Sequence, residues 1–149
     1  MRTSILLASF LTLLSLGCRK DQSAIDREKI LQYLADNNIT NAVEDPSGIF
    51  HVIDQPGSGG HPNLASTVIV KYKGYFLDKT VFDQTDPGKT IEFPLFNLIQ
   101  GWQIAIPLLQ KGGKGTFWIP SELGYGSNPP GGIPADAVLI FEIELVDFY

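Results

Sequence analysis

The segment Leu139-Ile140-Phe141-Glu142-Ile143-Glu144-Leu145 carries the pattern that decides the fold class of this chain. Every second position holds a large apolar residue, and two of the three positions between them hold glutamate. This period of two is typical of a strand that buries one face and keeps the other mostly polar. We therefore expect residues 137–146 to form the closing strand of a half-buried sheet.

The chain before this segment predicts further strands separated by turns, since Gly (15 residues) and Pro (10 residues) are frequent. A single short helix is expected over residues 98–109, and its regular part should end near Ile106 because Pro107 follows. The result is an α+β layout, a mostly antiparallel sheet with one short helix to cover one face. The other strands are expected over residues 49–53, 66–77, 80–83, 91–93 and 116–119.

The amino terminus has the pattern of a secretory signal. Arg2 precedes an apolar run over residues 5–16, and Gly17 and Cys18 follow it. The run is shorter than the roughly 20 residues that span a bilayer. The stretch before Cys18 resembles a bacterial lipoprotein signal, which implies that Cys18 is lipidated and becomes the first mature residue; the alternative is a plain signal peptide. A lipid on Cys18 would anchor the protein to a membrane surface.

These boundaries divide the chain into three parts: a lipoprotein signal peptide over 1–17, a tether with a helix over 18–43, and a folded domain over 44–149. The helix is expected from about Ala24 to Asn37, with Ser23 as its cap. It either packs on the domain or spaces the domain from the membrane.

Composition excludes several function classes. The net charge of −5 argues against a nucleic-acid partner, which would require a basic patch. With Cys18 as the single cysteine, an intrachain disulfide and a cysteine-based zinc site are excluded. His51 and His61 lack the spacing of metal ligands, and the glycine-rich stretches 57–60 and 112–115 fit no phosphate-binding motif. We expect no metal and no cofactor.

Several short motifs in a fixed order carry a family resemblance. They are similar to those of the FKBP-type peptidyl-prolyl cis-trans isomerases, and the match runs from about Gly48 to Val146. In chain order the motifs are Val70-Lys71-Tyr72-Lys73-Gly74-Tyr75, Val81-Phe82-Asp83, Leu98-Ile99-Gln100-Gly101-Trp102, Gly124-Tyr125-Gly126, Gly132-Ile133-Pro134 and residues 139–145.

The resemblance implies an FKBP-like fold, in which a curved antiparallel sheet wraps around the short helix, here preceded by an N-terminal helix. A prolyl pocket would lie between sheet and helix. Periodicity alone would make its aromatic residues ordinary core residues. The implied catalytic set is Trp102 as the floor, Tyr72, Phe82 and Phe141 as walls, Tyr125 as a hydroxyl donor at the mouth, and Asp83 beside the rotating amide. The implied substrate-binding set is Ile91, Leu98, Ile99 (with its backbone N–H) and Ile133.

Three positions depart from the family pattern. Ile91 stands where a wall aromatic is common, and Lys79 stands where a turn glycine is usual. The basic residue that often pairs with the counterpart of Asp83 has only Lys89 as a nearby candidate.

The function implied is an envelope-anchored isomerase that speeds the folding of exported proteins by stabilising a twisted amide in an apolar pocket. Expected partners are proline-containing polypeptides, a membrane through Cys18, and macrolide-type inhibitors. The anchored protein would face the periplasm or the cell surface. The alternatives are a prolyl-binding chaperone module with little turnover and a structural lipoprotein in which the fold is only a spacer.

Overall fold

The computed structural model describes residues 21–149. The predicted signal peptide (1–17) and the predicted lipidation residue Cys18 lie outside the described residues. The elements are α1 (Gln22–Asp36), β1 (Val43–Glu44), β2 (Phe50–Gln55), β3 (Thr67–Tyr75), β4 (Val81–Gln84), β5 (Ile91–Pro94), α2 (Gln100–Ala105), β6 (Lys114–Ile119) and β7 (Leu139–Phe148), with short 3-10 turns η1 (Leu95–Asn97), η2 (Ile106–Leu108) and η3 (Ser121–Leu123).

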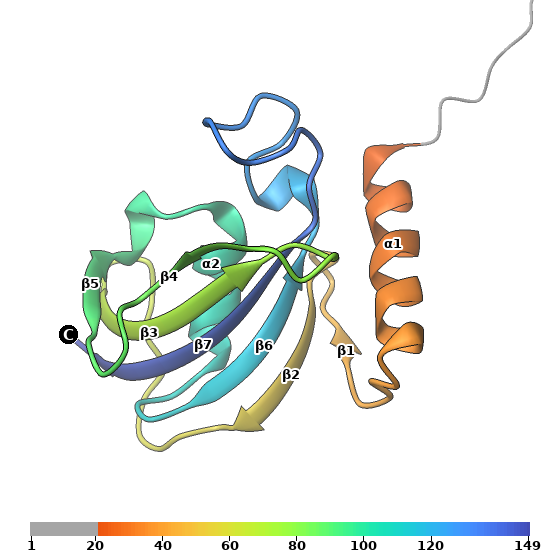
Figure 1. Ribbon diagram of the computed structural model, residues 1–149. Helices are drawn as coiled ribbons and strands as arrows, with labels where there is room; N and C mark the ends of the chain where they lie inside the picture. The colour runs from red at the N-terminus through yellow and green to blue at the C-terminus, as the bar shows by residue number, and fades with distance from the viewer. Residues whose placement is uncertain (1–20) are drawn as a thin grey trace, which may run out of the picture.

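The strands form one antiparallel sheet in the order β1-β2-β6-β7-β3-β4, and β5 also pairs with β3. The sheet curves around α2, while α1 stands beside it near β1 (Figure 1). This confirms the predicted α+β fold with a curved sheet, a short helix and a preceding helix. The two-residue strand β1 was not predicted, because two residues show no periodicity.

The concave face of the sheet and α2 enclose the main core. From β7 it contains Leu139, Phe141, Ile143 and Leu145, each at most 3% exposed. The alternation that predicted this strand is therefore confirmed. Trp102 of α2 lies in the same core and faces these strands.

A second core lies between α1 and the opposite face of the sheet. Ile30 and Leu34 of α1 are buried in it together with Trp118 of β6 and Ile140 of β7. The helix therefore packs on the domain. The prediction that Ser23 caps it is wrong: α1 begins at Gln22, whose side chain bonds to Asp26 one turn later and extends the helix backward.

The short helix begins later than predicted. Leu98 and Ile99 are extended, and α2 starts at Gln100, because the Gln103 side chain donates to the carbonyls of Leu98 (2.8 Å) and Phe96 (3.1 Å) and holds that segment outside the helix. The helix ends at Ala105, one residue before the predicted end, and then tightens into η2.

The turn between β3 and β4 shows how the chain accommodates Lys79. This residue has φ +71°, a conformation that favours glycine. The turn is closed by the Lys79 N–H bond to the Phe76 carbonyl (2.9 Å) and the Thr80 N–H bond to the Asp78 side chain (2.9 Å). These bonds offset the strain of a side chain at the turn position.

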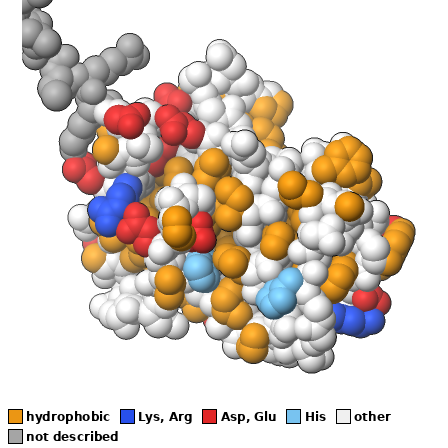
Figure 2. All heavy atoms as spheres, turned by 180° about the vertical axis from the view of Figure 1, so that it is seen from behind, with side chains coloured by type: hydrophobic (Ala, Val, Ile, Leu, Met, Phe, Trp, Pro, Cys, Tyr) orange, Lys and Arg blue, Asp and Glu red, His pale blue; other side chains and the backbone are white. Residues whose placement is uncertain are grey.

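The surface away from the view of Figure 1 is mixed in character. Figure 2 shows hydrophobic side chains scattered among uncharged ones there, with Lys and Arg side chains at two separate places. Positive charge on that face is dispersed.

Over residues 21–149, none of the helices combines the length and apolar character that crossing a bilayer requires.

Candidate active site

A cavity of about 210 Å³ opens between α2 and the strands that curve over it. The strands supply most of its walls, with lining residues from β3, β4, β5 and β7. Eight of its nine lining residues belong to the predicted site. The lining is Tyr72, Phe82, Asp83, Phe93, Leu98, Ile99, Trp102, Tyr125 and Phe141.

Perpendicular aromatic rings form the base of the cavity. The ring of Trp102 meets those of Tyr72 (5.0 Å between centroids, 86°) and Phe141 (5.2 Å, 87°) edge to face. Phe82 meets Phe141 in the same way (5.6 Å, 88°). Each such pair contributes about 0.5–1.5 kcal/mol beyond its buried area. The rings therefore hold one another in place without a ligand, and the cavity is formed in advance.

Two glycines allow this close packing. A Cβ atom on Gly74 of β3 would lie 2.8 Å from ring atoms of both Phe82 and Phe141. A Cβ atom on Gly101 of α2 would collide with the side chain of Ile119 on β6. Any larger residue would push the aromatic wall outward or lift the helix from the sheet.

The polar centre of the cavity is a hydrogen bond across β3 and β4. The Tyr72 hydroxyl donates to the Asp83 carboxylate at 2.6 Å. Burial, the hydrogen bond and the negative charge of Asp83 raise the pKa of Tyr72 above its ordinary value. The hydroxyl thus stays protonated, and the bond fixes the carboxylate beside the aromatic floor.

Tyr125 stands at the rim of the cavity, on the loop after η3. It is 36% exposed, and burial together with the charge of Asp83 raises its pKa. Its hydroxyl therefore remains a donor at neutral pH at the rim of the cavity.

The backbone at the start of α2 supplies a second donor. Ile99 is the N-cap residue of the helix, and within residues 21–149 its N–H has no acceptor. The extended segment before it is held by Gln103, as described above. Gln103 was not predicted from the sequence. The pattern that could have indicated it is a glutamine one turn into a helix, where its side-chain amide can reach back to carbonyls of the extended segment before the helix.

Two of the predicted lining residues lie beside the cavity. Ile91, 40% exposed, borders a neighbouring hollow with Tyr72, Asp83 and Lys89, and Ile133 borders another with Phe82 and Tyr125. Within residues 21–149 no ion pair joins Lys89 to Asp83.

Phe93 supplies the aromatic ring on the Ile91 side of the cavity. Its ring tilts against Tyr72 (6.4 Å) and meets Trp102 at 84° (6.2 Å). Sequence reasoning missed it, although Ile91 and Phe93 share a face of one strand and only Phe93 is aromatic.

The chemistry of the site is therefore that of a preformed apolar cavity with a few fixed hydrogen-bonding groups. Over residues 21–149, no three His, Cys, Asp or Glu side chains are grouped as metal ligands. Such a cavity, in a sheet curved around a short helix, defines a class of binding proteins whose apolar pocket holds a small apolar group while a few polar groups fix its orientation.

Comparisons with known proteins identify the class. Residues 59–146 match the family model for FKBP-type peptidyl-prolyl cis-trans isomerase. The chain is 37% identical over 131 residues to the isomerase FkpA of Aeromonas hydrophila, covering 86% of this chain and 49% of the relative. It is 38% identical over 103 residues to "Outer membrane protein MIP" of Legionella longbeachae, covering 68% of this chain and 44% of the relative.

Solved structures of peptidyl-prolyl isomerases share the fold of this chain. FkpA from Escherichia coli superposes with a TM-score of 0.75 at 31% identity, over 85% of this chain and 61% of that one. A peptidyl-prolyl isomerase from Pseudomonas syringae gives a TM-score of 0.72 at 29% identity, over 85% of this chain and 95% of that one.

The chain belongs to the family of FKBP-type peptidyl-prolyl cis-trans isomerases. It spans about half the length of the curated relatives it matches.

Proposed function

We propose that this protein is a peptidyl-prolyl cis-trans isomerase that accelerates the folding of exported polypeptides. The observation that carries the proposal is the preformed aromatic cavity on Trp102, with the Tyr72–Asp83 hydrogen bond as its polar centre. The cavity suits an uncharged five-membered ring, and the family of the chain supports the reaction type.

The physical demand of the reaction fits such a cavity. Rotation about an X–Pro bond faces a barrier of about 20 kcal/mol, because resonance stabilises the planar amide. The twisted amide has lost that resonance and is less polar than the planar one. Apolar walls therefore favour the twisted form. An acceleration of about 10⁵-fold requires roughly 7 kcal/mol of differential stabilisation and no covalent step.

Each residue has a distinct part in this mechanism. The proline ring rests on Trp102 between aromatic walls. The Ile99 N–H and the Tyr125 hydroxyl bind backbone carbonyls on either side of the proline. Asp83, held by Tyr72, stands beside the rotating amide. The hollows bordered by Ile91 and Ile133 receive the neighbouring residues of the chain, and macrolide-type inhibitors compete for the same cavity.

The alternative is a chaperone that binds prolyl segments with little turnover. An isomerisation assay on proline-containing peptides, with the chain from Arg19 to Tyr149, separates the two. Acceleration well above the uncatalysed rate supports the enzyme. Binding of the peptides by folded protein without acceleration would leave the chaperone.

For its location, we propose a bacterial cell envelope and a lipid on Cys18. The apolar run before the cysteine supports this, as does the similarity to the Legionella longbeachae relative, which is named an outer membrane protein. The Cys18→Ala variant should move from the membrane fraction to the soluble fraction. Unchanged fractionation would refute the lipid anchor.

A further inference from the structure

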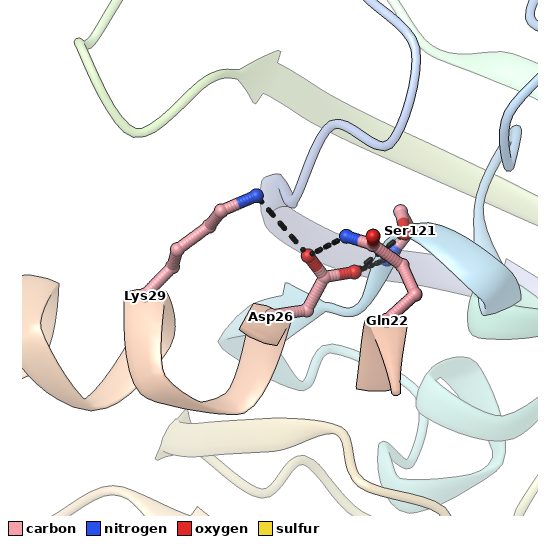
Figure 3. A network of polar contacts seen from close by, with 4 residues as sticks. All are labelled: Gln22, Asp26, Lys29 and Ser121. Carbon is pink, nitrogen blue, oxygen red and sulfur yellow. Dashed lines mark hydrogen bonds and ion pairs between the residues drawn. The ribbon is translucent and has the colours of Figure 1, made fainter. Parts of the chain in front are cut away.

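Asp26 is a buried carboxylate on the N-terminal helix, outside the cavity. Its side chain is 0% exposed. One carboxylate oxygen accepts from the backbone N–H (2.8 Å) and the hydroxyl (2.5 Å) of Ser121. The other accepts from Gln22 (2.8 Å) and contacts the ammonium group of Lys29 (3.3 Å) (Figure 3). The carboxylate thus joins α1 to the first residue of η3, 95 positions away in the sequence.

Ser121 passes this connection on to the rim of the cavity. Its carbonyl oxygen accepts from the N–H groups of Gly124 (3.0 Å) and Gly126 (2.8 Å). These two glycines flank Tyr125, which lines the cavity mouth. Both polar ends of the Ser121 backbone are therefore occupied, one by α1 and the other by the segment that presents Tyr125.

We propose that Asp26 is a positioning residue for the cavity, acting through Ser121 to hold Tyr125 at its rim. The inference rests on the proposed function for its catalytic consequence, while the positioning itself is a matter of structure. It gives the N-terminal helix a part in the site.

The chemistry of the junction requires a carboxylate. Two donors of one residue converge on a single oxygen, and two further donors converge on the other, so the group accepts on both sides. Loss of a hydrogen bond to a charged group is strongly destabilising when the partner stays buried, because the partner has given up water and gains no bond in exchange. Without Asp26, the Ser121 N–H and hydroxyl would be buried and unpaired unless η3 moved and exposed them to water.

The test compares Asp26→Ala with Leu34→Ala in protein expressed from the full sequence. Leu34 lies about two turns along the same helix and is buried in the second core, so its removal weakens the docking of α1 without touching Ser121. Asp26→Ala should speed amide exchange at Gly124 and Gly126 at least about tenfold relative to the sheet. Leu34→Ala should change all amides of the domain together. Equal selective effects of the two variants would overturn the proposal.

Turnover gives a second readout. Asp26→Ala should lower kcat/KM on a proline peptide about three- to tenfold, since small displacements at a site slow reactions strongly. In a Tyr125→Phe background the same change should alter kcat/KM less than about twofold. Equal losses in both backgrounds would show that Asp26 acts only through overall stability and would overturn the proposal.

Two further variants keep the test decisive. If Asp26→Ala does not fold, Ser121→Ala removes only the hydroxyl bond and Asp26→Asn keeps one acceptor oxygen. Both should fold, with smaller selective increases in exchange at Gly126; no increase would refute the proposal. If the wild-type protein shows no isomerase activity, the proposed function fails, and the exchange comparison still decides whether Asp26 positions Tyr125.

Discussion

Tyr72 and Asp83 are joined by a 2.6 Å hydrogen bond across two neighbouring strands, inside the aromatic cavity. The same strand carries a second tyrosine–carboxylate pair, since Tyr75 donates to Glu142 at 3.0 Å. Tyr75 belongs to the second core, on the other face of the sheet. The two pairs share a chemistry and differ in location, so each provides a control for the other.

Removal of the Tyr72 hydroxyl should therefore affect catalysis selectively. Tyr72→Phe leaves the aromatic wall in place and frees the Asp83 carboxylate. We expect kcat/KM to fall about three- to tenfold, equivalent to about 1 kcal/mol. Tyr75→Phe should cost similar stability and leave kcat/KM within about twofold of wild type. Equal losses of activity in the two variants would contradict the role given to the Tyr72–Asp83 bond.

The floor of the cavity can be tested with the two tryptophans. Both are buried, Trp102 to 4% and Trp118 to 2% exposure, and the Nε1 atoms of both lack a hydrogen-bond partner among the described residues. Trp102→Leu should lower kcat/KM about 100-fold by removing the surface under the proline ring.

Trp118→Leu is the matched control for this change. It should destabilise the protein by a few kcal/mol, because the smaller side chain leaves a cavity in the second core, between α1 and the sheet. Under conditions where circular dichroism shows that both variants are folded, Trp118→Leu should keep most of its activity. A comparable loss in both would mean that stability, not the cavity floor, limits turnover.

Gly74 allows a test of the shape of the cavity wall. In Gly74→Ala the added methyl group meets Phe82 and Phe141 at 2.8 Å, so both rings must shift. We expect kcat/KM to fall at least about tenfold and stability to fall by about 1–3 kcal/mol. Gly60→Ala is the control, because its nearest neighbour would be Phe148 at 4.0 Å. Wild-type peptide turnover in Gly74→Ala would show that the wall adapts.

The buried tyrosines predict how stability depends on alkaline pH. Burial and nearby carboxylates raise the pKa of Tyr72 and of Tyr75 in the folded protein, whereas the unfolded chain ionises near pH 10. Below that pH both states keep the proton and stability is unaffected. Above it the unfolded state loses protons first, so the free energy of unfolding falls as pH rises.

Urea unfolding between pH 8 and pH 11 measures this dependence. Tyr75→Phe should show a shallower fall than wild type, because one of the contributing groups is gone. Identical slopes would mean that Tyr75 ionises at its ordinary pKa in the folded state.

Much of the site could be predicted because its residues carry local signals. Most of the predicted aromatic and aliphatic positions lie in short motifs whose order matches a family, and seven of them meet in one cavity together with Asp83. Phe93 was missed because strand periodicity does not distinguish two residues on the same face. Its selection depends on the tertiary packing that brings its ring against Trp102. Gln103 was missed because its carbonyl partners depend on where α2 begins.

By itself, the sequence determined most of the strands, the turns and the presence of a short helix, because alternation and turn-forming residues act within a few positions along the chain, and its ordered motifs indicated the family. Tertiary structure decided which contacts unite distant segments. The docking of α1 and the bond from Asp26 to Ser121 depend on two helical segments meeting at the end of a curved sheet. A buried carboxylate on a helix shows no pattern that names its partner, since hydrogen bonds between elements are set by the packing of the whole domain.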